Sequence, residues 1–195
     1  RRRLAYDELL AHQLAISIIR NSNQKKLGIF FNKKSNLTEN FIKKLPFELT
    51  KSQNKAWDEI KEDLMSRDQM VRLLQGDVGS GKTIIALLSM LLAVESGYQA
   101  SIMVPTSILA NQHFQNISEL LKHSSIKIIL LTGKDKGKNR LEKIKIIENG
   151  EANIIIGTHA LIQDDINFKS IGIVVVDEQH RFGVFQRMAF TYKGV

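Results

Sequence analysis

The sequence predicts an α/β domain in three layers, with a mainly parallel sheet between two layers of helices. Three observations support this prediction. From about residue 71 onward, short apolar runs alternate with longer stretches of helical pattern. Two of the short runs, at 154–156 and 173–176, are apolar at every position, as strands covered on both faces are. A glycine-rich loop at 76–83 lies between a short apolar run and a long one, which is a strand–loop–helix arrangement.

The composition fits one globular domain with an appendage. The chain has 195 residues, of which 43% are hydrophobic and 25% charged, as in ordinary soluble proteins. No apolar run reaches the length of a membrane span, and the N-terminal arginines are not followed by the apolar core of a signal peptide. The absence of cysteine excludes disulfides and thiolate metal sites. We therefore expect a cytoplasmic protein with no membrane partner.

The first 45 residues are predicted to be a linker helix and a basic connector. Apolar residues recur at helical spacing over 3–19, and residues 21–40 lose that pattern and gain Asn, Ser and Lys, as a linker does. Residues 1–45 hold ten Lys or Arg and three acids, a balance of +7 out of the net +8. This charge fits either contact with a polyanion such as nucleic acid or a solvated linker.

The main domain is predicted over 46–195. Pro46 closes the connector, and Thr50 is placed to cap a helix near 51–65. Strands are then expected near 71–75, 100–104, 126–131, 153–157 and 172–176, and helices near 82–95, 107–122 and 135–149. Such an alternation predicts right-handed crossovers and a ligand at the carboxyl ends of the strands.

The loop at 76–83 reads GDVGSGKT and fits the phosphate-binding pattern G-x-x-x-x-G-K-[ST]. Glycines let the backbone wrap closely around a polyphosphate, and the next helix presents its free N–H groups to the same anion. Lys82 is expected to reach the β- and γ-phosphates, and the Thr83 hydroxyl to ligate Mg²⁺. A nucleoside triphosphate with Mg²⁺ is therefore expected at Gly76, Gly79, Ser80, Gly81, Lys82 and Thr83.

The second half of such a site is acidic. The apolar run at 174–176 is followed by Asp177, whose carboxylate is expected to hold Mg²⁺, and by Glu178, which is placed to polarise the attacking water. An apolar run before Asp-Glu is a weak indication of a catalytic site on its own, because strands often end in polar residues. About a hundred residues after a phosphate loop, it predicts triphosphate hydrolysis by Lys82, Asp177 and Glu178.

The sequence DEQH at 177–180 resembles motif II of superfamily-two helicases and translocases. Other stretches resemble further motifs of that superfamily, in the same order: LPFELT at 45–50 with Gln53 (the Q motif), VPT at 104–106 (motif Ia), LTG at 131–133 (motif Ib) and GTHAL at 157–161 (a DNA-contacting motif). Longer matches, GDVGSGKT, GTHALIQ and DEQHRFGV, resemble bacterial helicases that remodel stalled replication forks. The resemblance implies a RecA-like P-loop NTPase fold.

The resemblance also implies residue roles. Gln53 would read the adenine of ATP, with Phe47 nearby. Gln179 and His180 would couple the nucleotide to the DNA side. The residues that would lie along the DNA backbone are Thr106, Thr132 and Thr158, although threonines also cap helices and turns. The basic residues that follow, Lys134, Lys136, Lys138 and Arg140, either extend this face or are solvated, and His113 and His159 fit a structural role as well as a functional one.

As a whole, the resemblance implies the first motor lobe of an ATP-dependent DNA helicase that acts on branched DNA and stalled replication forks, in recombination and repair. A second RecA-like lobe and a wedge domain would belong to the same full-length chain, which is expected to be a monomer. The lobe alone would hydrolyse ATP poorly without an arginine finger. The alternative is a motor that displaces stalled RNA polymerase, against which Ser80 and Gln179 argue. A GTPase or transporter ATPase is disfavoured, because no Asn-Lys-x-Asp follows the loop and no Leu-Ser-Gly-Gly-Gln occurs.

Overall fold

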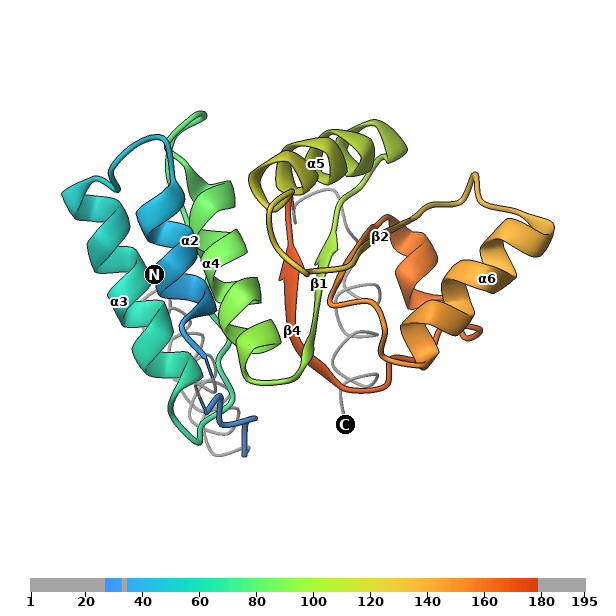
Figure 1. The fold of residues 1–195 in the computed structure, drawn as a ribbon, viewed down its shortest axis with the longest axis horizontal. Helices are drawn as coiled ribbons and strands as arrows, with labels where there is room; N and C mark the ends of the chain where they lie inside the picture. The colour runs from blue at the N-terminus through green and yellow to red at the C-terminus, as the bar shows by residue number, and fades with distance from the viewer. Residues whose placement is uncertain (1–26, 33–34, 179–195) are drawn as a thin grey trace, which may run out of the picture.

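Four parallel strands form the sheet in the computed structural model, which describes residues 27–32 and 35–178 (Figure 1). The elements are α2 (Leu37–Lys44), α3 (Lys51–Leu64), α4 (Lys82–Glu95), β1 (Gln99–Met103), α5 (Ser107–Leu120), β2 (Ile128–Leu131), α6 (Gly137–Glu148), β3 (Ile154–Gly157), the 3₁₀ helix η1 (His159–Ile162) and β4 (Ile171–Val176). The helix predicted near 3–19 lies outside the described residues.

The strand order is β2-β3-β1-β4, and each neighbouring pair is parallel. Met103 of β1 lies opposite Gly157 of β3 and Val176 of β4, and Leu131 of β2 lies opposite Gly157. The carboxyl ends of all four strands therefore meet at one edge of the sheet. The predicted three-layer α/β fold with a parallel sheet is confirmed.

Alternate residues of each strand face opposite layers. Ala100 and Ile102 of β1 belong to a core with α4 and α5, whereas Met103 belongs to a second core with α6 and η1. The chain crosses from β1 to β2 through α5 on one face and returns from β2 to β3 through α6 on the other. Residues on both faces of the strands are therefore apolar, as their sequences predicted.

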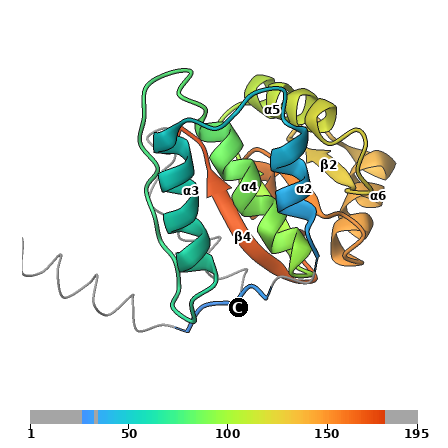
Figure 2. The same ribbon diagram turned by 60° about the vertical axis from the view of Figure 1, so that its left-hand side comes forward.

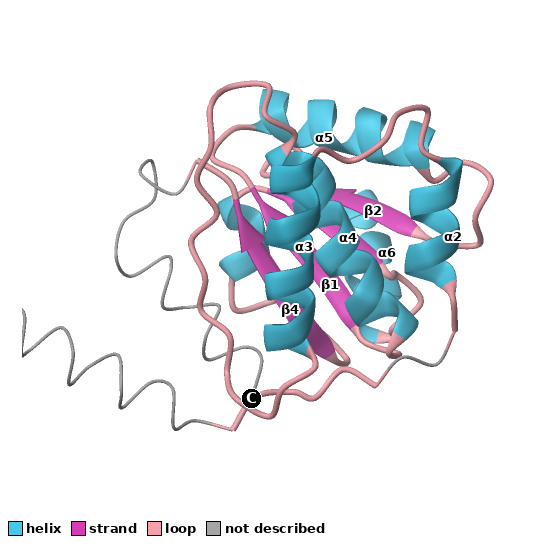
Figure 3. Ribbon diagram, turned by 90° about the vertical axis from the view of Figure 1, so that its left-hand side faces the viewer, coloured by secondary structure: helices cyan, strands magenta, loops and turns pink. Residues whose placement is uncertain are grey.

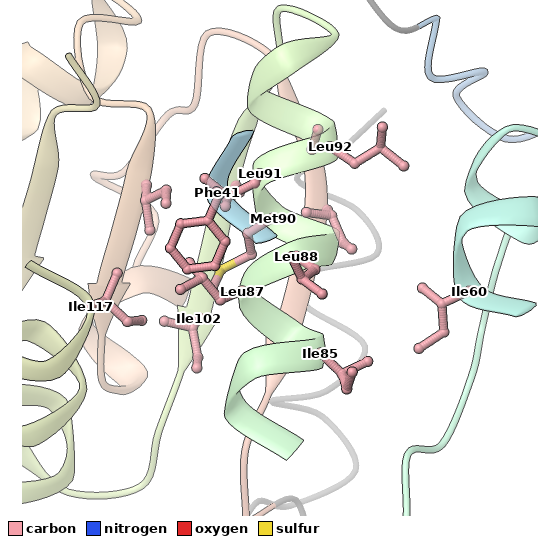
Figure 4. Close-up of a cluster of buried hydrophobic side chains, with 14 of the residues drawn as sticks. Phe41, Ile60, Ile85, Leu87, Leu88, Met90, Leu91, Leu92, Ile102 and Ile117 are labelled. Carbon is pink, nitrogen blue, oxygen red and sulfur yellow. The ribbon is translucent and has the colours of Figure 1, made fainter. Parts of the chain in front are cut away.

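The helix α4 is enclosed on nearly all sides. Figure 2 shows α4 between α2 and α3 and in front of β4, and Figure 3 shows the same helices covering one face of the strands. Leu87, Leu88, Met90 and Leu91 are fully buried, with Phe41 of α2 and Ile60 of α3 in the same cluster (Figure 4). This enclosure explains why 84–94 is apolar at every position except Ser89, whose buried hydroxyl donates to the Ile85 carbonyl, rather than amphipathic.

The strand predicted near 71–75 is wrong. This segment runs beside α3 without pairing to a strand (Figure 2), and Val71 and Leu73 are 85% and 63% exposed. Arg72 fixes the segment to α3 through ion pairs of 2.7 Å to Glu59 and Asp63. A short run with three apolar residues indicates extended backbone, but a strand also requires a neighbouring strand with which it forms ladder hydrogen bonds. In the described sheet β4 is the last strand of the order, and the segment 71–75 does not pair with it.

The linker predicted over 21–40 is also wrong from residue 37 onward, where α2 begins. Thr38 and Phe41 are buried, and the Thr38 amide and hydroxyl donate to Glu95 Oε2 of α4 at 3.1 and 2.7 Å. The helix α2 thus packs on α4, although the division of the chain between residues 45 and 46 stays a prediction. Within the described residues, every helix is too short or too polar to serve as a membrane span.

Candidate nucleotide site and nucleic-acid face

The predicted phosphate loop has the backbone geometry that its glycines allow. Gly79 and Gly81 have φ values of 79° and 82°, in the left-handed region where other residues are strained. Gly81 is the N-cap of α4 and has no side chain that could cap it, so no N-cap side chain accepts from the first amide groups of the helix. Lys82 Nζ donates to the carbonyl oxygens of Gly76 and Asp77, at 2.7 Å each, and Thr83 is exposed in the same turn.

Gln53 contacts this loop directly. It forms a capping box with Thr50, in which Gln53 Oε1 accepts from the Thr50 amide at 2.9 Å and the Thr50 hydroxyl accepts from the Gln53 amide at 3.2 Å. Its Nε2 donates to the Ser80 carbonyl at 2.8 Å, and a β-carbon at Gly81 would overlap this nitrogen. The side-chain amide of Gln53 therefore joins α3 to the loop. The sequence did not predict this contact. Its contact with adenine, and that of the 45% exposed Phe47, stay predictions.

Asp177 lies at the carboxyl end of β4 and is held at three points. Its amide donates to the Met103 carbonyl at 3.0 Å, which extends the pairing of β4 with β1 by one residue. Its Oδ1 accepts from the Glu178 amide at 3.0 Å, and its Oδ2 lies 3.0 Å from Nε2 of His113 on α5. The backbone and both carboxylate oxygens of Asp177 thus have defined partners.

The pKa of Asp177 is held below its usual value. The hydrogen bond from His113 is the main cause, and its effect outweighs partial burial, which alone would raise the pKa. The charge of Lys82 also lowers the pKa of Asp177, so the phosphate loop and the acidic strand end lie within electrostatic reach of each other. An ionised carboxylate near the loop is the form that binds a cation.

Glu178 has a strained backbone. Its φ is 51°, and within 27–32 and 35–178 it is the one residue other than glycine with a positive φ. Such a conformation costs on the order of 1–3 kcal/mol and is concentrated at functional sites.

The residues present fit a triphosphate that carries its own metal ion. Among the described residues, no group of three His, Cys, Asp or Glu side chains could hold an ion. Mg²⁺ is commonly held by one or two protein oxygens together with substrate phosphates rather than by a cage of protein side chains. Asp177 and the Thr83 hydroxyl are the residues that would supply such oxygens.

Three threonines follow the other strand ends at the same edge of the sheet. Thr106 caps α5 and accepts from the Leu109 amide at 3.3 Å, and Thr158 caps η1 and is 3% exposed. Thr132 is 4% exposed, and its amide and hydroxyl donate to Asp135 Oδ2 at 2.8 and 3.3 Å. The capping alternative is thus confirmed for Thr106 and Thr158, and Thr132 stabilises a turn. Contact of the three with DNA stays a prediction.

Arg140 is held by contacts within the protein rather than solvated. Its guanidinium binds Asp165 at 2.9–3.1 Å and Gln163 at 2.7 Å, and only 16% of the side chain is exposed. The pair joins α6 to the segment that follows η1. Lys134, Lys136 and Lys138 are exposed and could still extend a phosphate-contacting face. Gln179 and His180 lie outside the described residues, so their roles stay predictions.

A phosphate loop and an ionised aspartate at one edge of a parallel sheet define a P-loop NTPase. The protein-family model described as DEAD/DEAH box helicase matches residues 50–192, and the chain belongs to that family. Over 100% of its length the chain is 50% identical to the ATP-dependent DNA helicase RecG of Thermotoga maritima, and over 99% it is 46% identical to that of Aquifex aeolicus. It spans only 25% and 24% of these two relatives.

Solved structures agree with this assignment. The chain superposes on RecG bound to a three-way DNA junction with a TM-score of 0.85, at 47% identity, covering 94% of this chain and 25% of that one. It superposes on the UvsW helicase of bacteriophage T4 with a TM-score of 0.57 at 22% identity, covering 83% and 58%. The second likeness supports the fold, which is the RecA-like fold expected from the sequence.

Proposed function

We propose that this chain is the first motor lobe of an ATP-dependent DNA helicase that acts on branched DNA and stalled replication forks. The observation that carries the proposal is that the phosphate loop, which leads into α4, and Asp177, at the end of β4, lie at the same edge of the parallel sheet. The charge of Lys82, which lowers the pKa of Asp177, agrees with this placement. The RecG relatives and the RecG structure with a three-way DNA junction support branched DNA as the substrate, and they favour this task over displacement of RNA polymerase.

Each residue of the site has a distinct task in this proposal. When bound, ATP with Mg²⁺ supplies the phosphoryl group whose transfer to water drives translocation. Lys82 and the N-terminal amide groups of α4 would neutralise the charge of the phosphates. Asp177 and Thr83 would hold Mg²⁺, and Glu178 would take the proton of the attacking water on its carboxylate.

The partners follow from the same proposal. The full-length protein would bring a second RecA-like lobe and a wedge domain to this lobe and act as a monomer in the cytoplasm. Thr106, Thr132 and Thr158 at the strand ends, with the exposed lysines after Thr132, would contact the DNA backbone without reading its sequence. Gln53 and Phe47 would contact adenine, and Gln179 and His180 would couple the two ligands.

The test is the ATPase rate of the full-length protein with forked DNA, linear duplex or no DNA. We expect the greatest stimulation by the fork. Lys82→Ala should lower the rate by about 10²-fold or more, because the positive charge that neutralises the phosphates is lost. Most DNA binding should be retained. Lys169→Ala is the control, since Lys169 lies just before β4 at the opposite edge of the sheet. An unchanged rate in Lys82→Ala would reject this site.

A further inference from the structure

His113 is the polar member of an otherwise apolar helix face. On α5, Ala110 and Ile117 lie one turn to either side of it, and both are fully buried against the sheet. The His113 side chain is itself only 12% exposed, and its Nε2 lies 3.0 Å from Asp177 Oδ2. A largely buried polar side chain at such a position is expected to have a partner, and here the partner is the carboxylate of Asp177, which follows β4.

This contact leaves Asp177 able to bind a cation. A carboxylate has about four lone-pair sites on its two oxygens. The Glu178 amide occupies one site on Oδ1, and His113 Nε2–H occupies one on Oδ2. With its amide also paired to Met103, Asp177 has a fixed backbone and a fixed side-chain orientation, and its contacts within residues 27–32 and 35–178 leave one site on each oxygen for a cation.

We propose that His113 is a positioning residue that orients the Asp177 carboxylate toward the magnesium ion of bound ATP. The inference rests on the proposed function of the site and assigns a role to a residue outside the phosphate loop and the acidic strand end. Partners that hydrogen-bond to a metal-binding carboxylate fix its orientation, and their loss commonly costs about 10–100-fold in metal affinity. His113 also joins Asp177 to α5, whose cap, Thr106, lies at the strand edge expected to face DNA.

The test separates the metal-dependent part of nucleotide binding from the rest. In the full-length protein carrying Glu178→Gln, which should prevent turnover, ATP affinity is measured by equilibrium titration with Mg²⁺ and with EDTA. The ratio of the two affinities gives the gain due to the metal. His113→Phe keeps a ring of similar size but removes the donor, and His113→Gln keeps an N–H donor near the position of Nε2. Gln115→Ala, at an exposed position of α5, is the control.

We expect His113→Phe to reduce the metal-dependent gain by about tenfold or more, with the affinity in EDTA unchanged. His113→Gln should retain most of the gain, and Gln115→Ala all of it. If the phenyl ring does not fit, His113→Ala removes the same donor without added volume and should show the same loss.

Two results would overturn the inference. One is a metal-dependent gain in His113→Phe and His113→Ala equal to that of Gln115→Ala. The other is an equal loss of affinity with and without Mg²⁺, which would indicate a role in packing alone. If the parent protein bound no ATP in either condition, the proposed function itself would fail, so the two failures are distinguishable.

Discussion

Three residues near the site have a backbone conformation that favours glycine, and only two of them are glycine. Gly79 and Gly81 adopt it without cost, which lets the loop turn twice before α4 begins. At Glu178, the side chain is kept in spite of the strain, with the Glu178 amide held by Asp177 Oδ1 at 3.0 Å. A glycine at position 178 would relieve the strain but would have no carboxylate. A functional role of the Glu178 carboxylate is therefore the feature that accounts for a strained residue at this position.

Glu178→Gln should therefore separate ATP binding from hydrolysis. Glutamine keeps the shape of the side chain but cannot accept the proton of the attacking water, so we expect single-turnover hydrolysis to fall by about 10²-fold or more. ATP retention, measured by filter binding, should stay close to that of the parent. Glu142→Gln, an exposed position on α6, is a suitable control. Hydrolysis at the parental rate would exclude Glu178 as the base.

At the scale of elements, the turn between β2 and α6 is stabilised by one carboxylate. Asp135 accepts from the amide and hydroxyl of Thr132 and from Lys143 Nζ at 2.6 Å, and Lys143 also donates to the Leu130 carbonyl at 2.8 Å. Burial opposes ionisation of Asp135, but the hydrogen bonds from Lys143 and Thr132 outweigh it and hold its pKa below the usual value. The turn after the predicted motif Ib therefore depends on an ionised Asp135.

Asp135→Asn should destabilise the domain at neutral pH and have less effect in acid. Because the pKa of Asp135 is lower in the folded state, its stabilisation is complete above the unfolded value of about 3.9 and is lost as the pH falls through the folded value. We expect a loss of about 1–3 kcal/mol in the free energy of unfolding at pH 7, since hydrogen bonds to a charged group are removed. Urea denaturation of the 195-residue chain and its Asp135→Asn variant at several pH values measures this loss in the free energy of unfolding. A difference between the two proteins that stays constant below pH 4 would contradict this account.

The elements also differ in how well the sequence predicts them. The helix at 82–95 was predicted at its observed bounds, because a glycine loop marks its start and an unbroken apolar run marks its length. The strand at 71–75 was predicted wrongly and α2 was missed, because both depend on which surface the chain packs against. The contacts of Gln53 with Ser80 and of His113 with Asp177 join residues 27 and 64 positions apart, and no local pattern contains them. Such links require the tertiary structure.

At the scale of the whole molecule, the described part of the chain offers no arginine to the phosphate loop. Its arginines are Arg67, Arg72 and Arg140. Arg72 is held by two carboxylates of α3, and Arg140 is held by Asp165. Arg67 follows the C-terminal end of α3, whereas the N-terminal end of that helix, at Gln53, contacts the loop. A 14-residue helix is about 20 Å long, so Arg67 is distant from the site.

The expectation that an arginine finger comes from a second lobe of the full-length protein predicts that the 195-residue chain binds ATP but hydrolyses it slowly. Arginine fingers accelerate phosphoryl transfer by about 10³–10⁵-fold in other nucleotide hydrolases, and here that charge would have to come from outside the described residues. We expect the full-length protein to exceed the 195-residue chain in steady-state ATPase rate by about 10³-fold or more, with both assayed on saturating forked DNA. Titration with ATP should give measurable binding for both proteins, which controls for folding of the shorter one. Equal rates would mean that this lobe carries a complete catalytic site without a second lobe.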